Sequence, residues 1–262
     1  MAHFGLFDPK ALGLAQLAHA LCILGYPDRA LAAAQDAIEH AHALGDALNL
    51  TNVMYSGGVT LLLRRDYDAA HRHAERMLAL AGEHGLPAYA GLAAEHHGMA
   101  LVGLGVLDEG LTALRKGLKC RTGRQAWRLT FGLGMLARAL LASGKLEEAE
   151  ATLSEALAVA ERTGDAHFTS ELWRLQSELL LRRGGGDALA AEDLLTRAIK
   201  LAREQSAKIW ELCAATSLAR LWTQQGRRAE AHDLLAPIYG WFTEGFDTAD
   251  LTDAKALLDE LA

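Results

Sequence analysis

Histidine is the side chain best suited to metal binding and proton transfer near neutral pH, and this chain contains 11 of them. Three pairs are close enough in sequence to suggest a shared site: His40 and His42, His71 and His73, and His96 and His97. A zinc-binding pair on one helix needs the i, i+4 spacing that places both rings on the same face. None of the pairs has that spacing and there is no Cys-x-x-Cys motif, so we expect no metal site.

The other residues that could do chemistry are single carboxyl, phenol and guanidinium groups. No Gly-x-Ser-x-Gly nucleophile motif and no phosphate loop of the form Gly-x-x-x-x-Gly-Lys-Ser/Thr is present. Glu95 and Tyr55 could act as acid and base, because a carboxyl against apolar side chains has a raised pKa. Arg138 and Arg174 could bind a carboxylate through paired N–H donors. Each role requires that the fold brings together residues far apart in the sequence.

The composition points to helices as the elements that carry these residues. Ala (50) and Leu (49) together make 99 of the 262 residues, whereas Val and Ile together make only 10. Strands are rich in β-branched residues, while Ala and Leu are strong helix formers, so we expect an all-α protein. A hydrophobic content of 51% excludes disorder as the default. The net charge of −7 argues against a nucleic-acid partner, which would require a basic face.

The expected location follows from what the sequence lacks. No stretch of about 18 uninterrupted apolar residues could cross a membrane, and the first eight residues show no secretion signal. Cys22, Cys120 and Cys213 are widely separated and form no disulfide framework, which suits a reducing compartment. We therefore expect a cytoplasmic protein with no membrane contact and no cofactor.

A repeat of about 40 residues decides the expected architecture. A small residue, followed by small or apolar residues four and seven positions later, recurs six times. The six first members are Ala30, Ala70, Gly110, Ala149, Ala191 and Ala231. Small residues at fixed spacing on two successive helices let the helices pack closely, as in tetratricopeptide (TPR) repeats. The sequence predicts a right-handed TPR-like α-solenoid of six helical hairpins with a C-terminal capping helix.

We expect a single domain over residues 1–262, because no linker interrupts the repeats. The hairpins are predicted at 9–45, 46–86, 87–123, 124–164, 165–205 and 206–240, with the cap at 241–262. An aromatic cluster stands at the end of the last repeat: Tyr239, Trp241, Phe242 and Phe246. A solenoid must cover its last apolar face, so we expect these rings to form the cap. The alternatives are a docking patch for a partner and self-association into a homodimer.

Four segments carry a resemblance to a known family: LGYPDRALAAAQDAI (24–38), ELCAATSLARLW (211–222), QGRRAEAHDLLAPIYGWFTEGFDTADL (225–251) and AKALLDEL (254–261). They resemble the TPR-like C-terminal regions of bacterial multidomain signalling ATPases, in which an ATPase domain precedes this region. Many members also carry a class III adenylate or guanylate cyclase or a DNA-binding domain. The resemblance implies a sensor or scaffold portion without the ATPase or cyclase activity. MYSGG (54–58) and EHHGM (95–99) depart from the family pattern.

In TPR stacking the inner faces of the first helices of the hairpins line a concave groove. The repeat phase places eight residues around a central pocket: Tyr55, Glu95, Met99, Trp127, Phe131, Gly134, Arg138 and Arg174. Gly inside a helix costs about 1 kcal/mol relative to Ala, so Gly134 marks either close packing or space for a ligand. We expect the pocket to bind a peptide or a small anionic ligand through Arg138 and Arg174. The alternative is that the glycines only tighten packing and the charges pair with one another.

Two further alternatives remain open. The pocket could be that of a small-molecule enzyme that uses Tyr55, Glu95 and Arg174, with His96 near the rim, although we expect a non-catalytic protein. An aromatic series also precedes the first helices of successive hairpins: Tyr89, Trp127, Phe168 and Trp210. At this spacing the rings are expected to pack between repeats, and the alternative is that they bind a partner protein.

Overall fold

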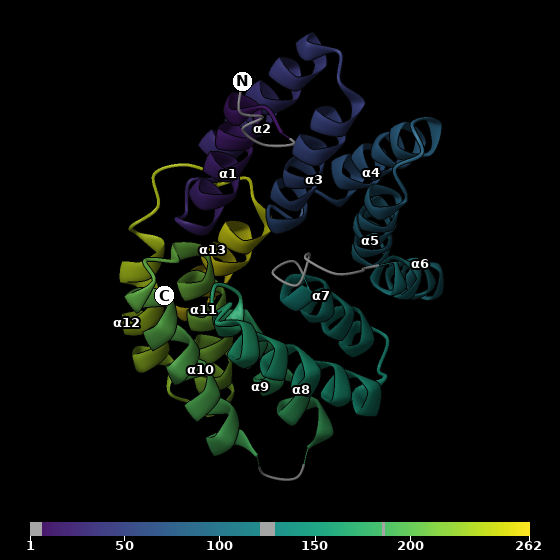
Figure 1. Cartoon of the computed structure of the whole chain (residues 1–262). Helices are drawn as coiled ribbons and strands as arrows, with labels where there is room; N and C mark the ends of the chain where they lie inside the picture. The colour runs from purple at the N-terminus through teal and green to yellow at the C-terminus, as the bar shows by residue number, and fades with distance from the viewer. Residues whose placement is uncertain (1–6, 121–128, 185–186) are drawn as a thin grey trace. The chain divides into compact units, whose positions relative to one another are not determined.

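A computed structural model describes residues 7–120, 129–184 and 187–262. Thirteen α-helices and no strand occur in these residues, which confirms the predicted all-α fold (Figure 1). The helices are α1 (Pro9–Ile23), α2 (Pro27–Leu44), α3 (Ala47–Leu63), α4 (Tyr67–Glu83), α5 (Pro87–Gly103), α6 (Leu107–Lys119), α7 (Leu129–Ala142), α8 (Leu146–Thr163), α9 (Thr169–Arg183), α10 (Ala188–Glu204), α11 (Lys208–Gln224), α12 (Arg228–Tyr239) and α13 (Ala249–Leu261). They form the six predicted hairpins, and α13 follows as the capping helix.

The described residues divide into two compact units. Unit 1 comprises 7–22 and 26–120, and unit 2 comprises 23–25, 129–184 and 187–262. The single solenoid domain over residues 1–262 stays a prediction. We call the first helices of the hairpins (α1, α3, α5, α7, α9 and α11) the A helices. The second helices (α2, α4, α6, α8, α10 and α12) are the B helices.

The turns between helices follow the local sequence. Gly45 ends α2 in the left-handed conformation, with φ 69°, and its N–H donates to the carbonyl oxygen of His42. Asp46 then caps α3 by accepting a hydrogen bond from the Leu48 N–H at 3.0 Å. Arg65 and Ser206 adopt the same left-handed conformation without being glycine, with φ 59° and 55°. A Cβ is strained there, so these two turns hold a conformation that their residues disfavour.

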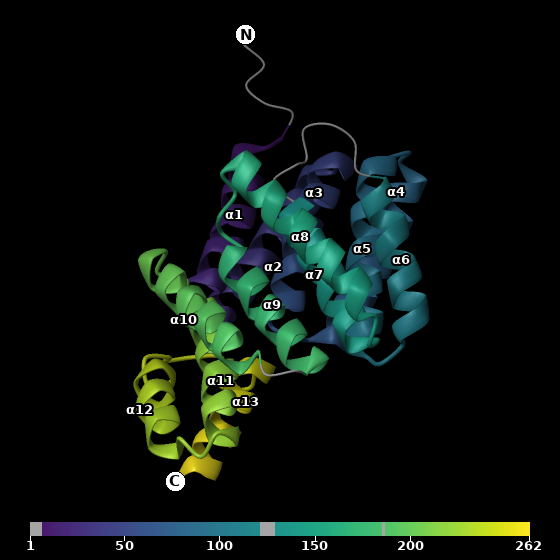
Figure 2. The same cartoon turned by 90° about the horizontal axis from the view of Figure 1, so that it is seen from below.

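Small residues bring the helices of unit 1 together. Ala30 and Ala70 are completely buried, as the repeat predicts. A Cβ on Gly98 would lie 2.6 Å from the carbonyl oxygen of Gly110, so α5 and α6 approach each other at backbone distance. Both views show these two helices side by side (Figure 1, Figure 2). The repeat residues therefore have the packing role that their spacing indicated.

Unit 2 stacks its A helices directly on one another. Helix α7 contacts α9, α9 contacts α11, and α11 contacts α13, while each B helix packs between successive A helices. The repeat residues Ala149, Ala191 and Ala231 are completely buried. This stacking places side chains from hairpins about 40 residues apart on neighbouring helices.

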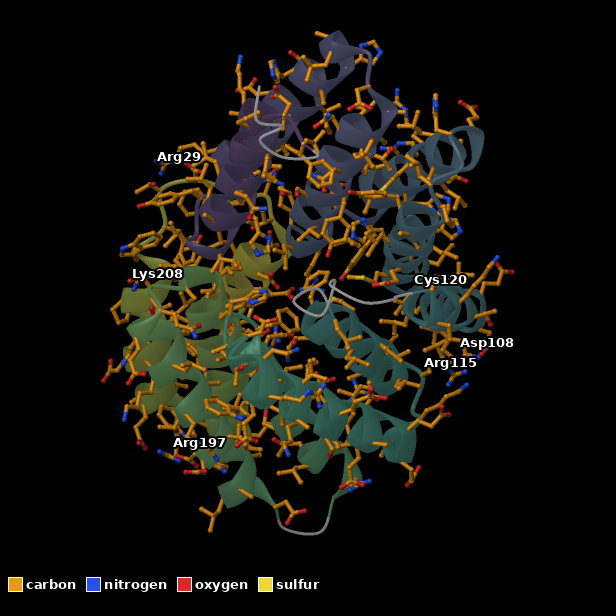
Figure 3. All side chains as sticks on the ribbon, viewed as in Figure 1. Arg29, Asp108, Arg115, Cys120, Arg197 and Lys208 are labelled. Carbon is orange, nitrogen blue, oxygen red and sulfur yellow. The ribbon has the colours of Figure 1, made fainter. Side chains whose placement is uncertain are left out.

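The aromatic segment before α13 contributes to the cap of unit 2. Phe242 is buried, and Trp241 packs edge-on against it with ring centroids 5.2 Å apart. The Lys208 ammonium lies 5.3 Å from the centre of the Trp241 ring. Lys208 is labelled in Figure 3. Phe246 packs against Tyr239 at 6.0 Å and stays 50% exposed. The alternative of a homodimer through this segment stays a hypothesis.

Candidate functional site

The predicted pocket residues fall into two groups, one in each unit. Tyr55, Glu95 and Met99 belong to unit 1, whereas Phe131, Gly134, Arg138 and Arg174 belong to unit 2. Trp127 lies outside the described residues.

In unit 1, helices α3 and α5 meet through polar and aromatic side chains. The Tyr89 hydroxyl donates a hydrogen bond to Oδ1 of Asn52 at 3.2 Å. The Tyr55 ring stacks on the imidazole of His96, with centroids 4.8 Å apart. All four side chains are buried. His96, which we expected near the rim, is 1% exposed and therefore lies in the interior.

Two glycines on α3 make room for imidazoles. A Cβ on Gly58 would lie 2.3 Å from Nδ1 of His96, and one on Gly57 would lie 3.3 Å from Cε1 of His73. His73 Nε2 donates to the carbonyl oxygen of Met54 at 2.7 Å, which fixes the ring as the Nε2–H tautomer. Burial lowers the pKa of His73, against the effect of that hydrogen bond. MYSGG (54–58) and EHHGM (95–99), the two segments that depart from the family pattern, thus pack against each other through Gly58 and His96.

His71 and His97 form a second pair between α4 and α5. Their ring centroids are 4.8 Å apart, and Nε2 of His71 lies 3.6 Å from the Glu75 carboxylate. Burial and the neighbouring His71 lower the pKa of His97, while Glu75 and Glu109 oppose this shift. Among the residues that the structure describes, no three His, Cys, Asp or Glu side chains are placed to hold a metal ion.

Glu95 lies beside α6, the partner helix of its own hairpin. A Cβ on Gly117 of α6 would lie 2.5 Å from Cγ of Glu95, so the methylene groups of Glu95 pack on that glycine. The side chain is 2% exposed. Met99, one turn further along α5, is also buried, at 6% exposure. The acid–base role expected for Glu95 with Tyr55 and His96 stays a prediction.

In unit 2, Arg174 on α9 is held by two carboxylates of the same helix. Its Nε and Nη2 donate to Glu171 at 2.7 and 2.8 Å, and its Nη1 donates to Glu178 at 3.3 Å. Burial disfavours the charge of Arg174, but Glu171 and Glu178 outweigh it and raise the pKa of the guanidinium. Glu178 also accepts from Arg182 at 2.7 Å. The donors of Arg174 are therefore engaged within α9.

The i, i+3 and i, i+4 spacing of Glu171, Arg174 and Glu178 could have revealed this network from the sequence. Neither glutamate was predicted as a member of the site, and Arg174 was expected to bind a ligand. In the structure Arg174 instead pairs with Glu171 and Glu178, as in the alternative that inner charges pair with one another.

Gly134 marks close packing. A Cβ there would lie 2.3 Å from Cε1 of Phe168 and 3.1 Å from Cδ2 of Leu172. Phe168 also packs edge-on against Phe131 at 5.3 Å and against Trp210 at 5.1 Å. The described members of the predicted aromatic series, Tyr89, Phe168 and Trp210, are all buried, as packing between repeats requires. Gly134 is therefore explained by packing and does not indicate space for a ligand.

Arg138 differs from Arg174 in its surroundings. It lies on α7 and is half-buried. It is close enough to the Cys213 thiol on α11 to act on it electrostatically, together with Glu171 and Asp250. Burial raises the pKa of Cys213 well above its ordinary value, so the thiol stays neutral.

A groove with a volume of about 320 Å³ lies on the B-helix side of unit 2. Its residues come from α10, α11 and α12 and include Ile199, Trp222 and Leu234. Trp222 is fixed there, because its Nε1–H donates to Glu192 at 2.8 Å and the Arg227 guanidinium lies over its ring. The groove is a second surface on which a partner could bind.

Comparison with known proteins supports the fold more than the function. No family model matches the chain. An uncharacterized protein from Rhizobium meliloti is 31% identical over 232 residues, which are 86% of this chain and 22% of the relative. The chain thus spans about a fifth of the length of the curated relative it matches.

Several solved structures share the fold. NprR in complex with its cognate peptide NprX is similar over 99% of this chain and 79% of its own, with 14% identity and a TM-score of 0.67. Apo RapI is similar over 97% and 86%, with 12% identity and a TM-score of 0.65. A STAND ATPase with a tetratricopeptide repeat sensor from Pyrococcus horikoshii is similar over 96% and 38%, with 16% identity and a TM-score of 0.50. At these identities the likeness shows a TPR-like helical repeat fold.

None of the described helices combines the length and the hydropathy needed to cross a bilayer.

Proposed function

We propose that this chain is a non-catalytic module that binds a protein or peptide partner on its A helices. One observation carries the proposal: apart from Thr248, every buried Asn, Ser, Thr, Glu or His of the described residues lies on an A helix. They are Asn49, Thr51, Asn52, Thr60, Glu95, His96, Thr130, Ser170, Glu171, Ser177, Glu211 and Thr216. The buried positions of the B helices are apolar or glycine.

Burying polar groups costs free energy unless they find partners, and a purely structural array of hairpins does not need them. A peptide chain brings backbone N–H and C=O groups that must be hydrogen-bonded wherever they leave water. Hydroxyl, amide and carboxylate groups can satisfy them, and among the buried positions of the two helix sets such groups lie on the A helices. Some of them already bond within the chain, since Thr51 and Thr60 donate to carbonyl oxygens of their own helix. The distribution of polar side chains therefore favours the A helices as the binding surface.

The comparisons support the same reading. The NprR structure holds a cognate peptide, and the P. horikoshii protein pairs a repeat sensor with a signalling ATPase. We infer by analogy that this chain is a ligand-sensing or scaffold part of a bacterial signalling protein in the cytoplasm. An association with adenylate cyclase or DNA-binding domains rests on the family resemblance alone.

The predicted pocket residues lie on the helices of the proposed surface, but most of them are buried beneath it. In unit 1, Tyr55 and Met99 on α3 and α5 are buried. In unit 2, Phe131 on α7 is buried, whereas Arg138 is half-buried and reaches the surface. Arg174 serves the surface by holding Glu171 and Glu178 in place, because its own donors are engaged.

Selection of a phage-displayed library of random dodecapeptides on the purified protein tests this proposal. We expect a small set of related sequences to be enriched and, as synthetic peptides, to bind with micromolar or tighter Kd in calorimetry. The proposal would be overturned if no sequence were enriched and the most frequent clones, as synthetic peptides, gave no heat of binding in calorimetry.

A further inference from the structure

Arg138 is the only ionisable residue of α7, whose sequence is otherwise apolar, Gly or Thr (LTFGLGMLARALLA). The side chain is half-buried. A guanidinium that has lost part of its hydration gains free energy where an anion or several acceptors replace the water. The role of Arg138 therefore depends on which groups surround its guanidinium.

The carboxylates of the neighbouring A helices are already engaged. Glu171 and Glu178 bind Arg174 and Arg182. On α11, Glu211 accepts from Arg203 and Lys208, each at 2.7 Å. No acidic side chain of α9 or α11 is left for Arg138.

Within unit 2, the described residues supply no anion that pairs with Arg138. None of the ion pairs or hydrogen bonds described for this unit includes Arg138. Residues 1–6, 121–128 and 185–186, which the structure does not describe, contain no Asp or Glu. The nearby Cys213 thiol is neutral and cannot act as a counter-ion.

We propose that Arg138 binds a carboxylate of the segment that occupies the A-helix face of unit 2. Guanidinium groups bind carboxylates through two parallel N–H···O bonds, which partial burial strengthens. Phe131 lies seven residues earlier on the same face of α7, where it is buried against Phe168. The inference rests on the proposed peptide binding and adds the class of side chain that is recognised, Asp or Glu or a chain terminus. A free small dicarboxylate would satisfy the same chemistry.

Two random dodecapeptide libraries separate these possibilities, one with all amino acids and one from which Asp and Glu are excluded. We expect the full library to yield acidic peptides, and replacement of Glu by Gln in a selected peptide to weaken binding about tenfold. Arg138→Gln should remove that tenfold preference, and Arg138→Lys should keep part of it. Arg197→Gln, which removes the same charge from α10, is the matched control and should change nothing.

The outcomes distinguish this inference from the proposed function. If both libraries yield equally tight peptides, or if Arg138→Gln keeps the preference for Glu, the role of Arg138 is overturned while peptide binding stands. If neither library yields a binder and glutarate does not bind in calorimetry, both proposals fail. If glutarate alone binds, and Arg138→Gln abolishes that binding, the carboxylate site stands with a free acid as its source. An unchanged midpoint of thermal unfolding for Arg138→Gln shows that the variant is folded.

Discussion

At the scale of single residues, Gly58 and Gly134 lack a side chain because aromatic rings fill the space where one would lie. Gly58 faces the imidazole of His96, and Gly134 faces the ring of Phe168. Both rings are 1% exposed, so neither can move into solvent to make room. The glycines are therefore constraints on packing.

Replacement of Gly134 by Ala tests this role. The added Cβ would overlap a ring that is packed on several sides, so we expect the free energy of unfolding to fall by roughly 2 kcal/mol. Gly13→Ala is the control, because nothing lies within 4 Å of its Cβ position. That variant should gain about 0.5–1 kcal/mol from the helix propensity of Ala. Urea unfolding measures both, and a neutral Gly134→Ala would contradict the packing assignment.

Two half-buried histidines, His73 and His97, make the stability of the protein depend on pH. The pKa values of His73 and His97 are lowered from 6.5 in the folded state, so the unfolded state binds more protons below that pH. Their contribution is constant well above pH 6.5, and stability is lost as the pH falls through 6.5 toward the folded values. His71, Glu75 and Glu109 are the titratable groups that face His97.

We therefore expect the midpoint of urea unfolding to be lower at about pH 5.5 than at about pH 8. His97→Gln should reduce the difference, because it removes one group that must stay neutral in the folded state. His84→Gln replaces an exposed ring and should leave the difference unchanged. A larger difference in His97→Gln than in the parent protein would contradict this assignment.

At the scale of helices and turns, the link between α10 and α11 combines strain with a strong ion pair. Ser206 adopts φ 55°, a left-handed conformation that is unfavourable for any residue with a Cβ. Glu211, one turn inside α11, is 3% exposed and is held by Arg203 and Lys208. Burial raises its pKa, but the hydrogen bonds from these two cations lower it overall. The ion pairs thus stabilise a turn that its own backbone disfavours.

Ser206→Gly should relieve that strain and raise the free energy of unfolding by roughly 0.5–1 kcal/mol, after the larger entropy of Gly in the unfolded chain is subtracted. Ser206→Ala keeps the Cβ and should bring no gain. Gly226→Ala, at a turn where glycine already adopts φ 81°, should be destabilising. Thermal or urea unfolding of the three variants tests the order, and equal stability of Ser206→Gly and Ser206→Ala would contradict it.

At the scale of the whole molecule, the sequence predicts the helices well because their cause is local and repeated. Small residues at fixed spacing and Gly–Asp turns such as Gly45–Asp46 specify each hairpin without knowledge of the others. The site is harder to predict, because the partner of a side chain depends on contacts that spacing alone does not give. The repeat phase placed Arg174 on the correct helix but could not show that Glu171 and Glu178 use its donors.

The sequence could not predict which residues neighbour Gly134 and His96, for a related reason. Phe168, which precedes α9, and Tyr55 on α3 cover them, and only the stacking of the hairpins brings these residues together. The concentration of buried polar side chains on the A helices emerges at the same scale, as a property shared by both units.

Hydrogen exchange measured with and without a selected peptide tests most directly whether the A helices bind the partner. The account predicts that added protection falls on the A helices, including α7 around Arg138, while α8, α10 and α12 exchange as before. Protection confined to the groove formed by α10, α11 and α12 around Trp222, or to the B helices of either unit, would contradict it.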